Sequence, residues 1–199
     1  YNPGMDVRIE NLPYVVTGTE VLQDQTITIE NGLIAGLTPT GKDEPQEGGD
    51  STNGATGPRG VSHGARTIDG RSLCAIPGFK NAHTHAAMTL LRGYGDDMRL
   101  QEWLQGKIWP AEGALEGTDV YWGTRLAALE MIRSGTTFAN DMYFFFPEAF
   151  QAFTDSGMRG AVGLALFDFF DPDQRQERQA AVDDLLDRFA TPRAPAGSG

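Results

Sequence analysis

The chain has 199 residues, 40% of them hydrophobic, and carries a net charge of −11 at pH 7. Its length suffices for one ordinary domain with a buried core, and its acidic surplus argues against nonspecific nucleic-acid binding, because attraction to phosphates requires clustered Lys and Arg. The single cysteine, Cys74, excludes a disulfide within the chain. We see neither an apolar run of about 18 residues nor a charged-then-apolar leader, so we expect no membrane span, no signal peptide and a cytoplasmic protein.

The first extended region runs from Val7 to Leu37. Polar and apolar residues alternate from Gln25 to Glu30, which predicts a strand. Asn31-Gly32 is a strong hairpin signal, because both turn positions favour positive φ. Residues 33–37 are then the return strand. Taken alone, this region is also compatible with a free-standing β-module.

Residues 38–66 interrupt this pattern with Gly, Ser, Thr, Pro and charged residues, few of which could enter a core. Such a composition predicts a flexible surface insertion. His63 lies within the insertion and is the only histidine besides His83 and His85. A ligand role for His63 would need an ordered loop, so we assign it none.

A short extended run follows the Pro77-Gly78 break and ends in His83-Thr84-His85. Side chains two residues apart in a strand project from the same face, so the two imidazoles are expected to point together. Two imidazoles on one face could share a metal ion, since histidine is a common zinc ligand. A chance pair, with one ring packed and the other solvated, is the alternative, and the pair alone does not decide between them.

Strand and helix patterns alternate three times after this run, which is typical of parallel β/α architecture. The predicted helices cover residues 86–92, 100–108, 119–133, 147–156 and 173–190, and the predicted strands cover 136–141 and 158–166. We expect Pro110 to end the helix over 100–108. Functional residues of barrels lie at strand ends, so Asn140, Asp141 and the aromatic run 143–146 are candidate pocket residues, with packing beneath a loop as the alternative.

Three segments together resemble a known family: PGFKNAHTHAAMTLLRGY (77–94), the segment from Trp103 to Glu112, and SGTTFANDMYFF (134–145). They are similar to the amidohydrolase superfamily, and within it to the methylthioadenosine/S-adenosylhomocysteine deaminases and their chlorohydrolase relatives. The resemblance implies an α/β fold: the first three β/α units of a metal-dependent (β/α)8 TIM barrel, preceded by part of a small β-sandwich. Residues 1–76 would be the sandwich part, with its insertion, and residues 77–199 the barrel part.

The same resemblance implies hydrolytic deamination of an adenosine derivative, of the 5'-methylthioadenosine or S-adenosylhomocysteine type. His83 and His85 would bind one divalent metal ion, zinc or alternatively iron. Trp103 and Glu112 belong to the segment that receives the nucleoside, and a carboxylate that accepts two hydrogen bonds suits ribose hydroxyls. The expected partner is a small nucleoside-type substrate, with no nucleic acid and no membrane. The full-length enzyme could also form a homo-oligomer.

The later elements of the family pattern are not found in this sequence. Family members take further histidines, a catalytic glutamate and a metal-binding aspartate from later strands, so we expect no catalytic residue in this chain. A (β/α)8 barrel needs about 250 residues, and we therefore expect an incomplete N-terminal portion that is inactive alone.

Two alternatives to this function remain. One is another amidohydrolase, of the guanine or cytosine deaminase or triazine chlorohydrolase type. The other is a non-catalytic, truncated copy. Some family deaminases carry a substrate-contacting arginine in the third strand, and residues 160–166 contain none, which leaves the exact substrate open.

Overall fold

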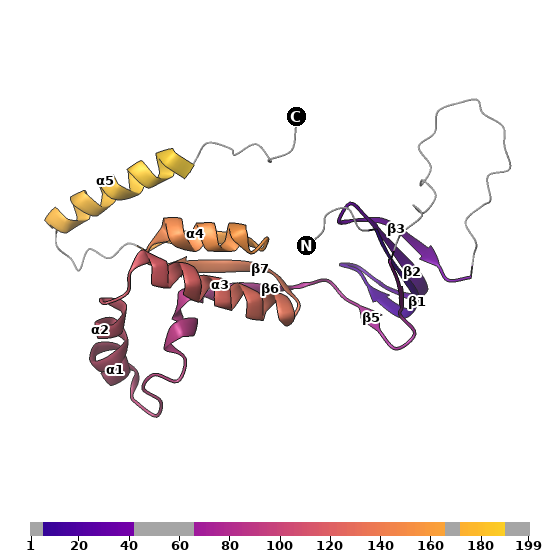
Figure 1. The fold of residues 1–199 in the computed structure, drawn as a ribbon, viewed down its shortest axis with the longest axis horizontal. Helices are drawn as coiled ribbons and strands as arrows, with labels where there is room; N and C mark the ends of the chain where they lie inside the picture. The colour runs from indigo at the N-terminus through magenta and orange to yellow at the C-terminus, as the bar shows by residue number, and fades with distance from the viewer. Residues whose placement is uncertain (1–5, 42–65, 166–171, 190–199) are drawn as a thin grey trace. The chain divides into compact units, whose positions relative to one another are not determined.

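The computed structural model describes residues 6–41, 66–165 and 172–189. They belong to two compact units, Tyr1–Pro77 and Gly78–Gly199 (Figure 1). Most of the predicted insertion, residues 42–65, lies outside the described residues. None of the helices in the described ranges has the length and apolarity needed to span a bilayer.

The first unit is one five-stranded sheet built on a long hairpin (Figure 1). Its order is β3-β2-β1-β4, and β5 also pairs with β1. β1 and β2 are antiparallel, as are β2 and β3, whereas β4 and β5 run parallel to β1. The strands are β1 (Val7–Val16), β2 (Val21–Glu30), β3 (Leu33–Pro39), β4 (Arg66–Asp69) and β5 (Cys74–Ala75).

The predicted hairpin turn between β2 and β3 is confirmed. Asn31 and Gly32 have φ of 50° and 77°, the left-handed pair that a two-residue turn requires. Leu12, Val15 and Ile27 form the core of this unit. The predicted β-sandwich is not confirmed, because the described strands of this unit form a single sheet.

The second unit is a three-stranded parallel sheet of order β6-β7-β8, against which α3 and α4 pack (Figure 1). The strand–helix alternation predicted for this region is confirmed in the described residues. The strands are β6 (Phe79–Thr84), β7 (Thr136–Tyr143) and β8 (Arg159–Leu164). The helical segments are η1 (Ala86–Leu91), α1 (Leu100–Trp103), η2 (Leu104–Ile108), α2 (Trp109–Glu112), α3 (Gly117–Arg133), α4 (Phe146–Asp155) and α5 (Pro172–Phe189).

Small residues bring α3 and α4 close to the sheet. Ala127 and Ala128 of α3 pack with Ala139 of β7 and with Phe153 of α4. Helix α3 begins where the Glu116 N–H donates to Asp119 Oδ2 at 2.9 Å, a contact that satisfies a free N–H at the helix start. This packing fixes the end of β7 beside the segment that follows β6.

The helical region after η1 differs from the prediction. Pro110 does not end the helix over 100–108 but stands in the first turn of α2. The reason is the π-helical turn η2, which adds a residue to the turn. The wider turn accommodates a residue without an N–H, whose ring would clash with the carbonyl four residues back in a regular α-helix. The helix therefore continues to Glu112.

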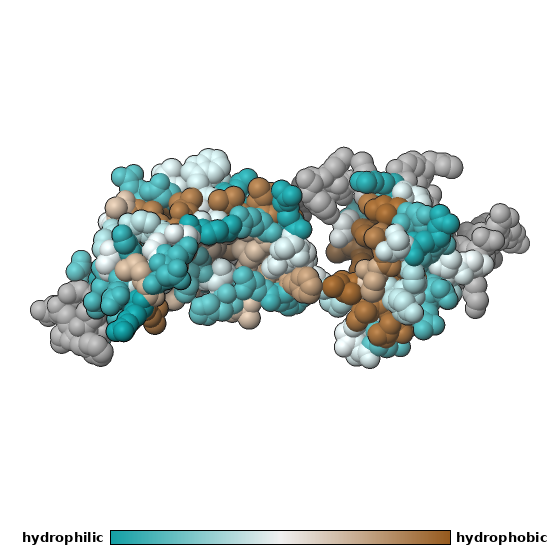
Figure 2. All heavy atoms as spheres, turned by 90° about the horizontal axis from the view of Figure 1, so that it is seen from below, coloured by the Kyte–Doolittle hydropathy of each residue, from teal (hydrophilic) through white to brown (hydrophobic). Residues whose placement is uncertain are grey.

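Hydrophobic side chains remain exposed in both units, and Figure 2 shows apolar surface on each. In the first unit, Leu33 and Ile34 are 73% and 72% exposed. In the second, Trp122 and Leu129 of α3 are 60% and 54% exposed.

Candidate metal site and substrate pocket

The rings of His83, in β6, and His85, directly after β6, lie close together. The ring centroids of His83 and His85 are 5.0 Å apart, with an angle of 79° between the ring planes. The pairing of β6 with β7 is irregular here. Asn81 pairs with Ala139 and Thr84 pairs with Asp141, so β6 contains one more residue than β7 between these pairs, as in a β-bulge. The separation is compatible with both rings reaching one ion at the usual Zn–N distance of about 2.0–2.1 Å.

A backbone carbonyl of the neighbouring strand orients His85. His85 Nδ1 lies 2.7 Å from the carbonyl oxygen of Met142. Because a carbonyl only accepts hydrogen bonds, Nδ1 carries a proton, and in the neutral imidazole Nε2 is then the nitrogen with the lone pair. Metal-binding histidines typically donate their second N–H to such a group, which fixes the tautomer and the ring orientation. The residues present therefore fit a metal ion.

Asp141 secures the backbone beside His85. Its Oδ1 accepts the Ala86 N–H at 2.7 Å, and the residue is 1% exposed. Burial raises the pKa of this carboxyl, and the Ala86 N–H and the nearby His85 oppose that rise. Asp141 Oδ2 is buried without a hydrogen-bond partner among the described residues. Asp141 was a candidate pocket residue, with packing as the alternative, and it is buried and does not belong to the residues that line the pocket described below.

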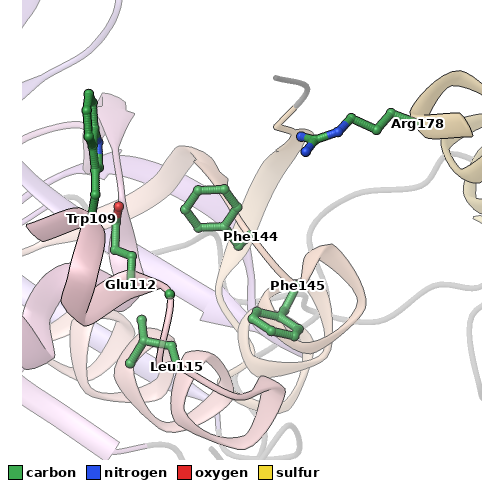
Figure 3. Close-up of a pocket in the computed structure, with 7 residues that line it drawn as sticks. Trp109, Glu112, Leu115, Phe144, Phe145 and Arg178 are labelled. Carbon is green, nitrogen blue, oxygen red and sulfur yellow. The ribbon is translucent and has the colours of Figure 1, made fainter. Parts of the chain in front are cut away.

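A pocket of about 590 Å³ opens beside the end of α2 and the loop after β7. Figure 3 shows Trp109, Glu112 and Leu115 on one side and Phe144 and Phe145 across from them. The lining residues are Trp109, Glu112, Gly113, Leu115, Phe144, Phe145 and Arg178. Aromatic walls with a single carboxylate suit a ligand that combines a planar ring with hydroxyl groups.

Glu112 is tied to the end of β7. The Tyr143 hydroxyl donates to Glu112 Oε1 at 2.9 Å, and Tyr143 is 4% exposed. Burial raises the tyrosine pKa strongly, and the bond to Glu112 adds to this rise. The hydroxyl therefore stays protonated and acts as the donor. Within the aromatic run 143–146, Phe144 and Phe145 line the pocket, whereas Tyr143 packs in the core with Ala87, Val120 and Ala149.

Trp103 does not belong to the residues that line this pocket. Its indole Nε1–H donates to the Tyr94 carbonyl at 2.9 Å, which ties α1 to the loop after η1. The tryptophan in the pocket wall is Trp109, 52% exposed. Sequence reasoning missed Trp109, although its place three residues before Glu112 was a usable signal. A substrate role for Trp103 stays a prediction.

The histidine pair has no third ligand nearby in the part of the chain that the structure describes. Within residues 6–41, 66–165 and 172–189, no group of three or more His, Cys, Asp or Glu side chains is placed to hold a metal ion. A catalytic zinc site normally uses three protein ligands. Within the described residues, the two rings that lie together as candidate ligands are those of His83 and His85.

Comparison with known proteins identifies relatives of this chain. Residues 74–196 match the model of the family described as "Amidohydrolase family". A 5-methylthioadenosine/S-adenosylhomocysteine deaminase from Archaeoglobus fulgidus is 60% identical over 107 residues, 53% of this chain and 25% of that protein. A 5'-deoxyadenosine deaminase from Methanoregula boonei is 52% identical over 119 residues, 60% of this chain and 27% of that protein. The chain thus spans about a quarter of the length of these relatives.

Solved structures give a similar result. An adenosine deaminase from Xanthomonas campestris with bound zinc has a TM-score of 0.64 and 31% identity, and the match covers 92% of this chain and 40% of that one. A triazine hydrolase from an Arthrobacter species has a TM-score of 0.69 at 22% identity, covering 96% and 44%, which indicates a shared fold alone. Because the family model covers more than half of its residues, this chain belongs to the amidohydrolase family.

Proposed function

We propose that the protein containing this chain is a metal-dependent aminohydrolase that deaminates an adenosine derivative of the 5'-deoxyadenosine or 5'-methylthioadenosine type. The observation that carries the proposal is the His83–His85 pair, with ring centroids 5.0 Å apart and His85 oriented by the Met142 carbonyl. The names of relatives at 52–60% identity support the substrate class.

His83 and His85 would hold one divalent ion, for which we propose zinc, with iron as the alternative ion. Zinc is favoured because imidazole nitrogens suit it and because the Xanthomonas campestris relative binds it. A divalent ion supplies Lewis-acid activation of water at neutral pH. The role of this chain is to present Nε2 of His85 and to keep its ring from rotating, through the Met142 carbonyl.

Glu112 and the aromatic walls would bind the nucleoside. Purine rings stack on aromatic side chains, and Trp109, Phe144 and Phe145 offer such surfaces. The Glu112 carboxylate accepts hydrogen bonds from sugar hydroxyls. A free base has no sugar to meet this carboxylate, so the pocket favours a nucleoside over a guanine or cytosine substrate. Trp103 is retained as a proposed substrate residue by the family resemblance.

We further propose that β6, β7 and β8 with their helices are the first three units of a (β/α)8 barrel. Residues 1–76 would contribute part of a small β-sandwich. Later strands of the complete protein would supply the remaining metal ligands and the carboxylate that moves protons. In a barrel the strand ends form one catalytic face, which agrees with the position of both histidines at the end of β6.

The test is an activity assay of the complete protein before and after metal removal. We expect ammonia release from 5'-deoxyadenosine or 5'-methylthioadenosine, its loss on treatment with a chelator, and its recovery on addition of zinc. Elemental analysis of the purified protein measures the metal directly. Full activity in metal-free protein, or turnover of free bases or triazines but not nucleosides, would refute the proposal.

A further inference from the structure

Tyr143 is held in place by the core rather than by a surface loop. It is the last residue of β7 and packs with Ala87, Val120 and Ala149. Only 4% of it is exposed. The position of its hydroxyl is therefore set by the sheet, η1, α3 and α4.

Glu112, in contrast, has a long and flexible side chain at the end of α2. Ordering a long side chain of this type costs conformational entropy. The Tyr143 hydroxyl meets Glu112 Oε1 at 2.9 Å across 31 residues of sequence, so the core defines where the carboxylate stands before any ligand arrives. A binding group ordered in advance loses less entropy when the ligand binds.

The hydrogen-bond count leaves acceptor sites for a ligand. An ionised carboxylate has two oxygens with about four lone-pair sites and no donor. Tyr143 uses a site on Oε1, which leaves Oε2 to accept from the pocket side. Among the described side chains that line this cavity, the carboxylate belongs to Glu112, so Glu112 is the anionic acceptor of these walls.

We propose that Tyr143 is a positioning residue: its hydroxyl fixes the Glu112 carboxylate so that the carboxylate receives the vicinal hydroxyls of a ribose. This inference rests on the proposed nucleoside function. It assigns a role in that function to Tyr143, which does not line the pocket. Tyr143 acts through Glu112, and no contact between Tyr143 and the substrate is needed.

Tyr143→Phe in the complete protein tests the proposal, because this change removes only the hydroxyl. We expect KM for 5'-deoxyadenosine to rise roughly tenfold, as for the loss of a hydrogen bond to a charged group, while kcat stays within about twofold. The decisive comparison uses 2',3'-dideoxyadenosine, which lacks both ribose hydroxyls. For this analogue the substitution should leave KM unchanged.

Tyr121→Phe is the matched control. The Tyr121 hydroxyl also donates to a carboxylate at 2.9 Å, that of Asp155, and neither residue lines the pocket. The Tyr121→Phe substitution should leave KM for both nucleosides unchanged. Equal KM changes for the two nucleosides in Tyr143→Phe, or none, would overturn the positioning role.

A second variant keeps the test informative if Tyr143→Phe folds poorly. In Glu112→Gln, the amide oxygen can still accept from Tyr143, but the amide nitrogen cannot accept from the ligand. We expect KM to rise for 5'-deoxyadenosine and not for the dideoxy analogue. An unchanged KM for 5'-deoxyadenosine would contradict the inference.

Calorimetric binding of adenosine separates this inference from the proposed function. If the complete protein binds adenosine without deaminating it, and Tyr143→Phe weakens binding about tenfold, the positioning role holds although the aminohydrolase function falls. If deamination is present but Tyr143→Phe affects neither KM nor binding, the function holds and the positioning role falls. If adenosine is not bound at all, both fall.

Discussion

His85 is held from two sides by consecutive residues of β7. The Met142 carbonyl receives the ring N–H at 2.7 Å, and Asp141 receives the N–H of the next residue, Ala86, at the same distance. Ring and backbone are therefore fixed by one strand. This arrangement leaves His85 with a single ring nitrogen for a ligand.

We expect His85→Asn to reduce the metal content of the complete protein at least tenfold. Loss of a residue that only hydrogen-bonds to a metal ligand already costs about 10- to 100-fold in metal affinity, and loss of a ligand itself should cost no less. His63→Asn, in the predicted insertion, is the control and should keep the metal. Mass spectrometric metal analysis of both variants gives the answer. An equal loss in the two variants would argue against the assigned ligand.

In the proposed function, substrate choice depends on Glu112, which lines the pocket. Glu112→Ala should raise KM for nucleosides by about tenfold to a hundredfold, as expected when hydrogen bonds to a charged group are lost. Activity on free adenine, if any, should barely change. Glu102→Ala, at an exposed residue of α1 outside the pocket, is the matched control. Steady-state kinetics on both substrates measures these changes. An unchanged KM for nucleosides in Glu112→Ala would show that the carboxylate has no binding role.

At the scale of elements, α3 and η1 meet at a glycine. A methyl group at Gly123 would lie 2.7 Å from the Ala87 carbonyl oxygen and 3.0 Å from Leu90 Cγ. The backbone of η1 follows directly after His85, so this contact sets the distance between the helix and the histidine segment. Only glycine permits the approach.

Overpacking usually costs about 1–3 kcal/mol, and alanine offsets about 1 kcal/mol of this through its higher helix propensity. We therefore expect Gly123→Ala to destabilise the complete protein by up to about 2 kcal/mol. Gly106→Ala, where nothing lies within 4 Å, should be neutral or stabilising. Urea unfolding of the two variants measures the difference, and a Gly123→Ala protein as stable as Gly106→Ala would disprove the close contact.

The elements also show where prediction from sequence failed. The pattern over 100–108 indicated a helix that ends at Pro110, whereas η2 widens and the helix continues to Glu112. A proline usually ends a helix, and a π-helical turn that accommodates one is too rare for local propensity to predict. The hairpin at Asn31-Gly32 was predictable because its φ angles are a local property of those two residues.

At the scale of the molecule, the three-stranded sheet has two strands with one unpaired side in the described residues, β6 and β8. Unpaired edges and exposed apolar side chains, such as Phe79 at 56%, favour association. We expect the isolated 199-residue chain to self-associate in a sedimentation velocity experiment. A monodisperse, cooperatively melting monomer would contradict this.

The same chain should bind zinc weakly, because its described residues contain two proposed ligands, His83 and His85, whereas catalytic sites use three. We expect an affinity weaker than micromolar in a zinc titration of the isolated chain, and tight binding only by the complete protein. Submicromolar affinity of the isolated chain would mean that it completes the site by itself. His83→Asn provides the background for nonspecific binding.

Local patterns in the sequence determined the pairing of His83 with His85, the β2–β3 turn and the alternation of strands and helices after Pro77. Each depends on residues close together in the chain, so periodicity and turn chemistry suffice to predict it. The tertiary structure decided which groups serve the site. The Met142 carbonyl lies 57 residues from His85, Tyr143 lies 31 from Glu112, and Trp109 rather than Trp103 lines the pocket. Those partners meet only when separate β/α units pack together, and no short-range pattern records the distance between them.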